Sequence, residues 1–220
     1  MGCRTPSKVE PVGRPDGPLP RAVSDAPALL AIGGPMKGAP RVEIRIETER
    51  LQLRPMGFDD ADRLASIFQD PVAMRHYPSL IDRPGTIRWI ERTITNYERF
   101  GYGLLVVERR DDGEFLGQCG FIPQTVGDEG GPEPEIAYLF VRRHWGHGYA
   151  TEAARACRDW GFRILGVPRL ISIISIHNEP SIRVAERNGM VPVAEITKPT
   201  GVPHRVYAIT REVWREFAGP

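Results

Sequence analysis

The pattern of apolar and polar positions predicts about seven strands. Apolar and polar residues alternate over residues 44–54, and Pro55 ends the alternation. Two β-rich stretches flank Asp111-Asp112-Gly113, a sequence typical of a hairpin turn. One later stretch is apolar on both faces, as in the middle of a covered sheet. The predicted strands cover residues 44–54, 102–109, 114–122, 135–141, 170–176, 191–196 and 205–209.

The remaining apolar residues follow a helical spacing. In residues 148–164, small and apolar side chains recur at intervals of three and four positions, and Gly166 and Pro168 predict the end of this helix. Strands and helices occur as a meander, a β-α-β unit and an α-β-β unit, which predicts a mixed α/β domain. The other predicted helices cover residues 58–69, 86–100 and 181–188, with a helical turn or two at 211–217.

The first forty residues differ in composition from the rest of the chain. They contain eight Pro and six Gly and have no Phe, Trp or Tyr. Such a segment has too few large apolar side chains to offset the conformational entropy lost on ordering. We therefore predict a disordered tail over residues 1–40 and one domain over residues 41–220.

Charge and cysteine content exclude several classes of protein. Basic and acidic residues number 29 and 28, which disfavours a nucleic-acid partner. The three cysteines are widely spaced and form no CxxC pair, so neither a disulfide framework nor a zinc site is expected. This cysteine usage favours a reducing, cytoplasmic location. The apolar runs fall far short of the ~20 residues that a membrane span requires, so no membrane partner is expected.

The segment 141–152, VRRHWGHGYATE, joins a predicted central strand to the longest helix. Gly146 and Gly148 allow a tight turn, and the free N–H groups of the first helical turn attract a phosphate. Arg142 or Arg143 would add positive charge. The alternative is a helix start that needs glycine for geometry alone. His144 and His147 are spaced like metal ligands, but no third ligand is evident, and we predict no metal.

Several motifs in this chain resemble the GNAT acetyltransferase superfamily. Its pyrophosphate loop is matched by Arg143, Gly146 and Gly148, and residues 149–153, YATEA, look like the continuation found in the branch that acetylates ribosomal-protein N-termini. That branch is also matched at residues 48–54, 178–181 and 207–214. The resemblance spans residues 44–217. It implies a mixed, mostly antiparallel sheet flanked by helices, with a splay between the fourth and fifth predicted strands.

The resemblance also implies acetyl-CoA as the acetyl donor. The pyrophosphate would lie on the backbone of residues 144–149, and the pantetheine arm would lie along residues 135–141, where the splay exposes main-chain groups. An N–H near Leu139 or Phe140 would polarise the thioester carbonyl. The expected donor-binding residues are Leu139, Phe140, Val141, Arg143, His144, Gly146, His147, Gly148, Tyr149, Ala150 and Asn178.

Acetyl transfer to an amine requires a base and an acid. Glu135, at the start of the splayed strand, is the candidate base; the alternative is a strand-end carboxylate in solvent. The tyrosine that often serves as the acid in the superfamily would fall at Ala185, so Ser181 is the expected substitute, as in the ribosomal-protein branch. Asn178 and Ser181 would alternatively only cap a helix. Tyr77, between the first two helices, would line the acceptor pocket together with Glu135.

The leading hypothesis is therefore an N-acetyltransferase that uses acetyl-CoA and transfers the acetyl group directly within a ternary complex. No covalent enzyme intermediate is needed, because the amine is itself the nucleophile. The acceptor would be a protein N-terminus or a small amine, and the protein a monomer or a homodimer. The alternative is a domain that binds acyl-CoA as a sensor or interaction module without turnover, which the alanine at position 185 favours.

Overall fold

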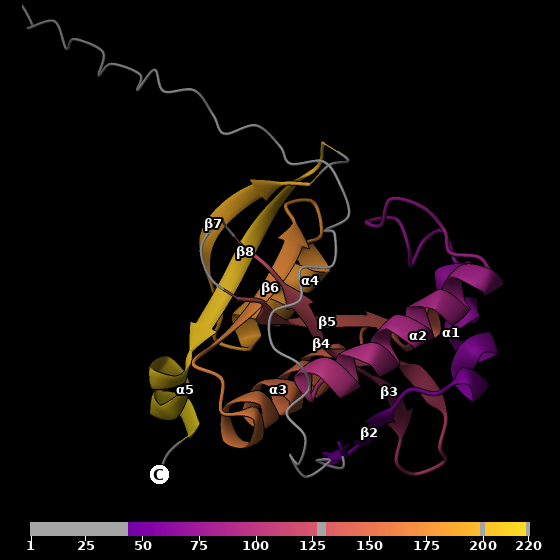
Figure 1. Cartoon of the computed structure of the whole chain (residues 1–220), viewed down its shortest axis with the longest axis horizontal. Coiled ribbons are helices and arrows are strands. Elements are labelled where there is room, and N and C mark those ends of the chain that lie inside the picture. The colour runs from indigo at the N-terminus through magenta and orange to yellow at the C-terminus, as the bar shows by residue number, and fades with distance from the viewer. Residues whose placement is uncertain (1–43, 127–130, 199–200, 219–220) are drawn as a thin grey trace, which may run out of the picture. The chain divides into compact units, whose positions relative to one another are not determined.

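A computed structural model describes residues 44–126, 131–198 and 201–218 of the chain. The predicted tail, residues 1–40, lies outside these residues, so the boundary between tail and domain stays a prediction. Among the described residues, an eight-stranded sheet has helices around it, with β2 and β7 toward opposite ends (Figure 1).

The strands follow the order β1-β2-β3-β4-β5-β6-β8-β7 across the sheet. Every neighbouring pair is antiparallel except β5 and β6, which are parallel. The mixed, mostly antiparallel sheet is therefore confirmed. The strands are β1 (Ile46–Glu47), β2 (Leu51–Pro55), β3 (Leu104–Arg109), β4 (Phe115–Gln124), β5 (Glu133–Phe140), β6 (Arg169–Ser175), β7 (Val191–Thr197) and β8 (Pro203–Thr210).

The sheet has eight strands because the opening stretch, predicted as one strand over residues 44–54, is divided in two. The amide of Thr48 donates to the carbonyl of Leu51 at 2.9 Å and closes a turn. β1 then folds back on β2, with Ile46 opposite Leu53. The alternation of apolar and polar residues does not reveal such a turn, because it continues through both strands of a hairpin.

Two groups of helices cover the two faces of the sheet. Side chains of α1 and α2 share one hydrophobic core with Leu139 of β5. Side chains of α3, α4 and α5 share the other with Ile136 and Phe140, as expected when successive residues of a strand point to opposite faces. The helices are α1 (Ala61–Phe68), α2 (Arg83–Phe100), α3 (Tyr149–Trp160), α4 (Glu179–Arg187) and α5 (Arg211–Ala218).

Helix α2 begins before its predicted start at residue 86. The carboxylate of Asp82 accepts a hydrogen bond from the amide of Gly85 at 2.8 Å, and Pro84 occupies the first turn. Both are favourable at a helix N-terminus. The segment before α2, residues 69–82, therefore forms a shorter loop than the sequence pattern suggests.

Strands β5 and β6 part almost as soon as they meet. Their register consists of the single pair Glu135 and Ile171, whereas β4 and β5 pair from Gly117 to Gln124. At the next position a side chain, not the backbone, joins the two strands: the hydroxyl of Ser172 donates to the carbonyl of Ile136 at 2.8 Å. The splay expected between the fourth and fifth predicted strands is confirmed, and it opens toward the loop that leads to α3.

Candidate active site

The segment between β5 and α3 forms an open loop at the mouth of the splay. Gly146 and Gly148 adopt φ angles of 82° and 81°, a conformation that favours glycine. A Cβ atom on Gly146 would meet nothing within 4 Å, and one on Gly148 would meet only the guanidinium of Arg50, at 3.6 Å. The outer side of the loop is therefore free to receive a ligand.

The start of α3 offers donors to that ligand. Within the described part of the chain, no side chain caps this helix, and its first internal bond runs from the amide of Glu152 to the carbonyl of Gly148. The amides of His144 and Trp145 already donate to the carbonyls of Val141 and Arg142. The loop therefore presents its amides from Gly146 onward, and the helix dipole favours an anion there.

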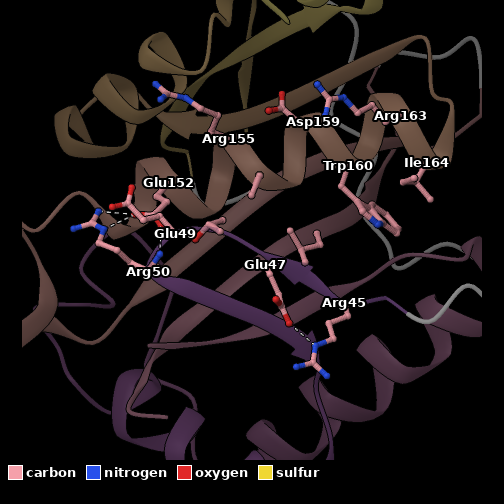
Figure 2. A pocket seen from close by; sticks show the side chains of 13 residues that line it. Arg45, Glu47, Glu49, Arg50, Glu152, Arg155, Asp159, Trp160, Arg163 and Ile164 are labelled. Carbon is pink, nitrogen blue, oxygen red and sulfur yellow. Dashed lines mark hydrogen bonds and ion pairs between the residues drawn. The ribbon is translucent and has the colours of Figure 1, made fainter. Parts of the chain in front are cut away.

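One side of the loop is held by Arg50 and Glu152. The guanidinium bonds to the carboxylate at 2.6 and 2.7 Å, and its other nitrogen donates to the carbonyl of His147 at 3.1 Å. The same guanidinium lies 4.8 Å from the ring centre of Tyr149, on which the His147 ring stacks at 5.8 Å. Figure 2 shows Arg50, just before β2, and Glu152 of α3 facing each other. The strand motif at residues 48–54 thus shapes the glycine loop.

The other side of the loop rests on Glu114. Its carboxylate pairs with Arg143 at 3.0 Å and with Arg109, and the His144 imidazole lies 3.2 Å away. The Arg143 bond contributes most to a lowered pKa of Glu114, while burial lowers the pKa of His144. His144 is buried beneath the loop, and Arg143 is largely exposed beside it. Arg143 is therefore placed to meet an anion, whereas the His144 ring supports the loop from below.

Strand β5, the expected donor strand, directs part of its backbone into the splay. The carbonyl of Ile136 faces β6, because it accepts the Ser172 hydroxyl. The N–H and C=O groups of successive residues in a strand point alternately to its two neighbours. Those of Tyr138 and Phe140 therefore point toward β6, as those of Ile136 do. The carbonyl of Phe140 accepts from the indole of Trp145 at 2.9 Å. The backbone of Tyr138 and the amide of Phe140 are accordingly directed where a pantetheine arm would lie.

Glu135 is buried at the point where the two strands part. Its side chain is only 7% exposed, so the alternative expectation of a carboxylate in solvent is wrong. The carboxylate accepts from the amide of Gln124 at 2.7 Å and from the backbone amide of Ile173 at 3.1 Å. Burial raises its pKa above the ordinary value, against the opposing effect of these bonds. A raised pKa brings a carboxylate closer to the strength that a general base needs near neutral pH.

The first turn of α4 lies beside the splay. Asn178 caps the helix, since its side-chain oxygen accepts from the amide of Ser181 at 3.4 Å. The half-buried Ser181 carries the candidate hydroxyl. Ala185, where the superfamily's tyrosine would fall, is buried in the core and only 1% exposed. A full-length aromatic ring would not fit there without repacking.

Tyr138 is a candidate site residue that the sequence analysis missed. Its hydroxyl donates to the carbonyl of Ser181 at 2.9 Å, tying the donor strand to α4. Burial raises the pKa of this phenol, so it stays protonated at neutral pH. The signal was present in the sequence, because Tyr138 is a hydroxyl-bearing side chain in the middle of the predicted donor strand.

Tyr77 reaches the same region from the loop between α1 and α2. The side chain is 36% exposed, but burial of its phenol and the negative charge of Glu135 raise its pKa to about 12. The loop is fastened to the donor segment where Asp70 pairs with Arg142 at 3.1 Å and Arg75 lies over the Trp145 ring. Tyr77 and Glu135 are thus within electrostatic reach of each other.

A separate groove of about 920 Å³ lies between the β1–β2 segment and the outer side of α3 (Figure 2). None of the predicted site residues lines it. Two ion pairs form among its charged side chains: Arg45 with Glu47 at 2.9 Å and Arg50 with Glu152 at 2.6 Å. The groove therefore lies behind the glycine loop, away from the candidate site.

Comparisons with known proteins agree with this geometry. The family model described as acetyltransferase (GNAT) domain matches residues 50–191. The chain belongs to the GNAT acetyltransferase family. The chain is 42% identical to the uncharacterized protein YkkB of Bacillus subtilis over 147 residues, covering 66% of this chain and 84% of that protein. GNAT proteins of this kind use acetyl-CoA, and this chain is an acetyl-CoA-dependent N-acyltransferase.

Solved structures of the family share the fold. The acetyltransferase from Agrobacterium tumefaciens is 33% identical, with a TM-score of 0.65 over 76% of this chain and 94% of that one. The ribosomal-protein-S5-alanine acetyltransferase from Vibrio fischeri is 17% identical, with a TM-score of 0.60 over 78% and 98%. At that identity the second likeness shows the fold alone. The expected GNAT membership is confirmed, and a member of the ribosomal-protein branch is among the structural neighbours.

Two further findings concern the described residues alone. None of their helices combines the length and the apolar character needed to cross a membrane. No three of their histidine, cysteine and acidic side chains are arranged to hold a metal ion.

Proposed function

We propose that this enzyme transfers the acetyl group of acetyl-CoA directly to a primary amine, either a protein N-terminus or a small molecule. In this proposal Glu135 accepts the proton of the amine, and Ser181 donates a proton to the departing thiolate. The observation that carries the proposal is the parting of β5 from β6 after one residue pair, with the buried carboxylate of Glu135 at the point of divergence.

The two proposed catalytic groups reach the splay from opposite faces of the sheet. Glu135 shares the face of Ala137 and Leu139, which α1 and α2 cover, whereas Tyr138 points to the face that carries α4 and Ser181. An unbroken sheet would separate these faces. The splay connects them, so an amine beside Glu135 and a thioester beside Ser181 would meet in the gap between the strands.

The proposed reaction uses two side chains and one backbone amide of this chain. The amine nitrogen attacks the thioester carbon, the carbon–sulfur bond breaks, and the amine proton passes to Glu135 directly or through a water. The thiolate of CoA takes a proton from the Ser181 hydroxyl, which regains one from water, and Glu135 returns its proton to the solvent before the next cycle. The amide of Phe140 would stabilise the charge that develops on the carbonyl oxygen, as an oxyanion-hole donor does.

The basicity of the acceptor decides how strong the base must be. A lysine amine has a pKa of ~10.4, against ~7.7 to 8.0 for an α-amino group, so deprotonating lysine at neutral pH takes about 3.5 kcal/mol more. A single carboxylate whose pKa is raised by burial suits the weaker requirement of an α-amine or a similarly acidic amine.

A thiol-release assay tests the proposal. Acetyl-CoA is incubated with the enzyme and a panel of short peptides and amines, and acetylated products are identified by mass spectrometry. We expect release of CoA that depends on both the enzyme and an amine. Tight binding of CoA by calorimetry, with no thiol released for any acceptor, would instead support the sensor hypothesis.

A further inference from the structure

One carboxylate links two loops that lie far apart in the sequence. Asp70 stands near the start of the α1–α2 loop, residues 69–82, and Arg142 stands near the start of the glycine loop, after β5. The Nε atom of Arg142 lies 3.1 Å from the Oδ2 atom of Asp70. The first loop carries the candidate acceptor residue Tyr77, and the second is the expected donor site.

The same carboxylate shapes its own loop. Its Oδ1 atom accepts from the amide of Val72 at 2.9 Å and from the amide of Ala73 at 3.4 Å. The amide of Met74 donates to the Asp70 carbonyl at 2.9 Å, and the amide of Tyr77 donates to the Met74 carbonyl at 2.8 Å. An aspartate that bonds to amides two and three positions on is typical of a tight turn. Asp70 therefore uses one oxygen to fold the segment that leads to Tyr77 and the other to reach the glycine loop.

Apolar packing holds this turn against the sheet. Ala73 and Met74 are buried, and they belong to the same hydrophobic core as Leu139 of β5. Val141, the residue before Arg142, packs against that core. The turn therefore rests on the strand that leads into the glycine loop, and the ion pair lies at the more exposed edge of this contact.

A second contact lies close to the ion pair. The guanidinium of Arg75 lies 5.6 Å from the centre of the Trp145 ring, a distance typical of a cation–π interaction. The indole of Trp145 donates to the Phe140 carbonyl at 2.9 Å, and its amide donates to the Arg142 carbonyl at 3.1 Å. Arg142 and Trp145 thus belong to one hydrogen-bonded turn, and both have a partner in the α1–α2 loop.

We infer that Asp70 is a positioning residue for the acceptor, because through Arg142 it ties the loop that carries Tyr77 to the loop that would bind the donor. The inference rests on the proposed function, and on Tyr77 lining the acceptor pocket. A donor that orders the glycine loop also holds the partner of Asp70 in place, so less conformational entropy remains to be lost when the acceptor binds. The bound donor therefore strengthens acceptor binding, and by linkage the acceptor strengthens donor binding equally.

Hydrogen exchange tests this link without any acceptor. CoA alone is the ligand, and exchange in residues 70–77 is followed by mass spectrometry in the free enzyme and at saturating CoA. We expect CoA to slow this exchange about threefold in wild type, the size of one partly exposed ion pair. In Asp70→Asn a side-chain oxygen still accepts the amides of the turn, but the charge that holds Arg142 is lost. CoA should then leave the exchange unchanged, and Arg142→Gln should give the same result.

Kinetics test whether the link acts on the acceptor. With any amine that the enzyme acetylates, and at saturating acetyl-CoA, we expect Asp70→Asn to raise the KM of the amine about threefold with kcat nearly unchanged. Arg142→Gln should raise it by the same factor, and the double variant should raise it no further, because each change removes the same pair. The matched control is Asp62→Asn, which breaks the exposed pair of Asp62 with Arg83 at 3.0 Å and should leave this KM at the wild-type value.

The outcomes separate the inference from the proposed function. If CoA gives no protection of residues 70–77 in wild type, or equal protection in wild type and Asp70→Asn, the inference is overturned. Full additivity of the two single variants in the KM of the amine would overturn it as well. Each of these results leaves the proposed function intact. Failure of every amine despite CoA binding would refute the proposed function instead, and the exchange experiment would still decide whether Asp70 links the two loops.

Discussion

Arg50 and Glu152 lie 102 positions apart in the sequence and form one guanidinium–carboxylate unit. The carboxylate also accepts the hydroxyl of Thr48 at 2.5 Å and the amide of Arg50 at 3.1 Å. Two sequence motifs that resemble the same family therefore meet in space. Through the bond from Arg50 to the His147 carbonyl, this unit fixes the glycine loop to the sheet.

Glu152→Gln should weaken donor binding and stability together. The variant loses the charge that holds Thr48 and Arg50, and hydrogen bonds to a charged group contribute about 1.5 to 3 kcal/mol. We expect the free energy of unfolding at neutral pH to fall by that amount. The affinity for CoA, measured by calorimetry, should fall about tenfold. Glu47→Gln, in the same groove but in an exposed pair with Arg45, should change neither.

The stability defect should also depend on pH. Burial opposes ionisation of Glu152, but the bonds from Thr48 and Arg50 outweigh burial and lower its pKa. A lowered pKa in the folded state stabilises the protein at neutral pH, and this contribution is lost as the pH falls below about 4.3. Denaturation curves of wild type and variant should converge in that range. A constant difference down to pH 3 would contradict the assigned role.

Gly148→Ala tests whether the loop needs its left-handed backbone. At a φ of 81° an alanine is strained by about 1 kcal/mol or more, whatever space surrounds it. We expect CoA affinity to fall about tenfold, and Gly148→Glu, which adds a negative charge beside the phosphates, to abolish measurable binding. The control is Gly57→Ala, where φ is −133° and no atom lies within 4 Å of the new Cβ. Unchanged affinity in both Gly148 variants would rule out this loop as the donor site.

Glu135→Gln should separate activity from stability. Removing a general base lowers turnover about 10²- to 10⁴-fold, while CoA binding should be preserved. A pKa raised in the folded state means that folding is favoured by the protonated carboxyl and that this contribution is lost as the pH rises through the folded-state pKa. The variant should therefore melt at a higher temperature than wild type at pH 8, and this difference in melting temperature should be smaller at pH 5.

The matched control for Glu135 is Glu133→Gln, two residues earlier on β5 and paired with Arg169. We expect its turnover to stay within about twofold of wild type. If Glu135→Gln also retained wild-type kcat, the carboxylate would not be the base, whatever its effect on melting.

Tyr138→Phe probes the tie between β5 and α4. Losing the bond to the Ser181 carbonyl should lower stability by about 0.5 to 1.5 kcal/mol. Because this bond positions the turn that carries Ser181, we expect kcat to fall about tenfold with KM for acetyl-CoA nearly unchanged. Tyr102→Phe, which removes a hydroxyl from another buried tyrosine, should leave kcat unaffected. A Tyr138 variant with a raised KM and normal kcat would assign the phenol to donor binding.

The sequence predicted the elements that are determined by residues close together in the chain. The Asp111-Asp112-Gly113 turn and the glycine loop depend on neighbouring residues, and both are found where they were expected. The helix predicted through residues 148–164 begins as expected, but α3 ends at Trp160 and a π-helical turn, Gly161–Leu165, continues it. The boundary errors also have local causes, such as the turn at Thr48 and the cap at Asp82.

Long-range contacts were not accessible in the same way. The burial of Glu135 depends on β6 and Gln124, and the role of Tyr138 depends on where α4 begins. Cys119 and Cys157 illustrate the same limit: they are 38 positions apart and looked unrelated, yet their sulfur atoms lie 3.7 Å apart in the core. Spacing along one sequence does not reveal which strand or helix supplies a partner.

The parting of β5 and β6 has a mechanical consequence. Across the middle of the sheet, a single register pair joins the five N-terminal strands to the three C-terminal ones, fewer than between any other neighbouring strands. A pantetheine chain laid into this junction would act as a missing ribbon and fasten the two halves together. In the proposed binding mode, acetyl-CoA would therefore also complete the pairing of the sheet while it is bound.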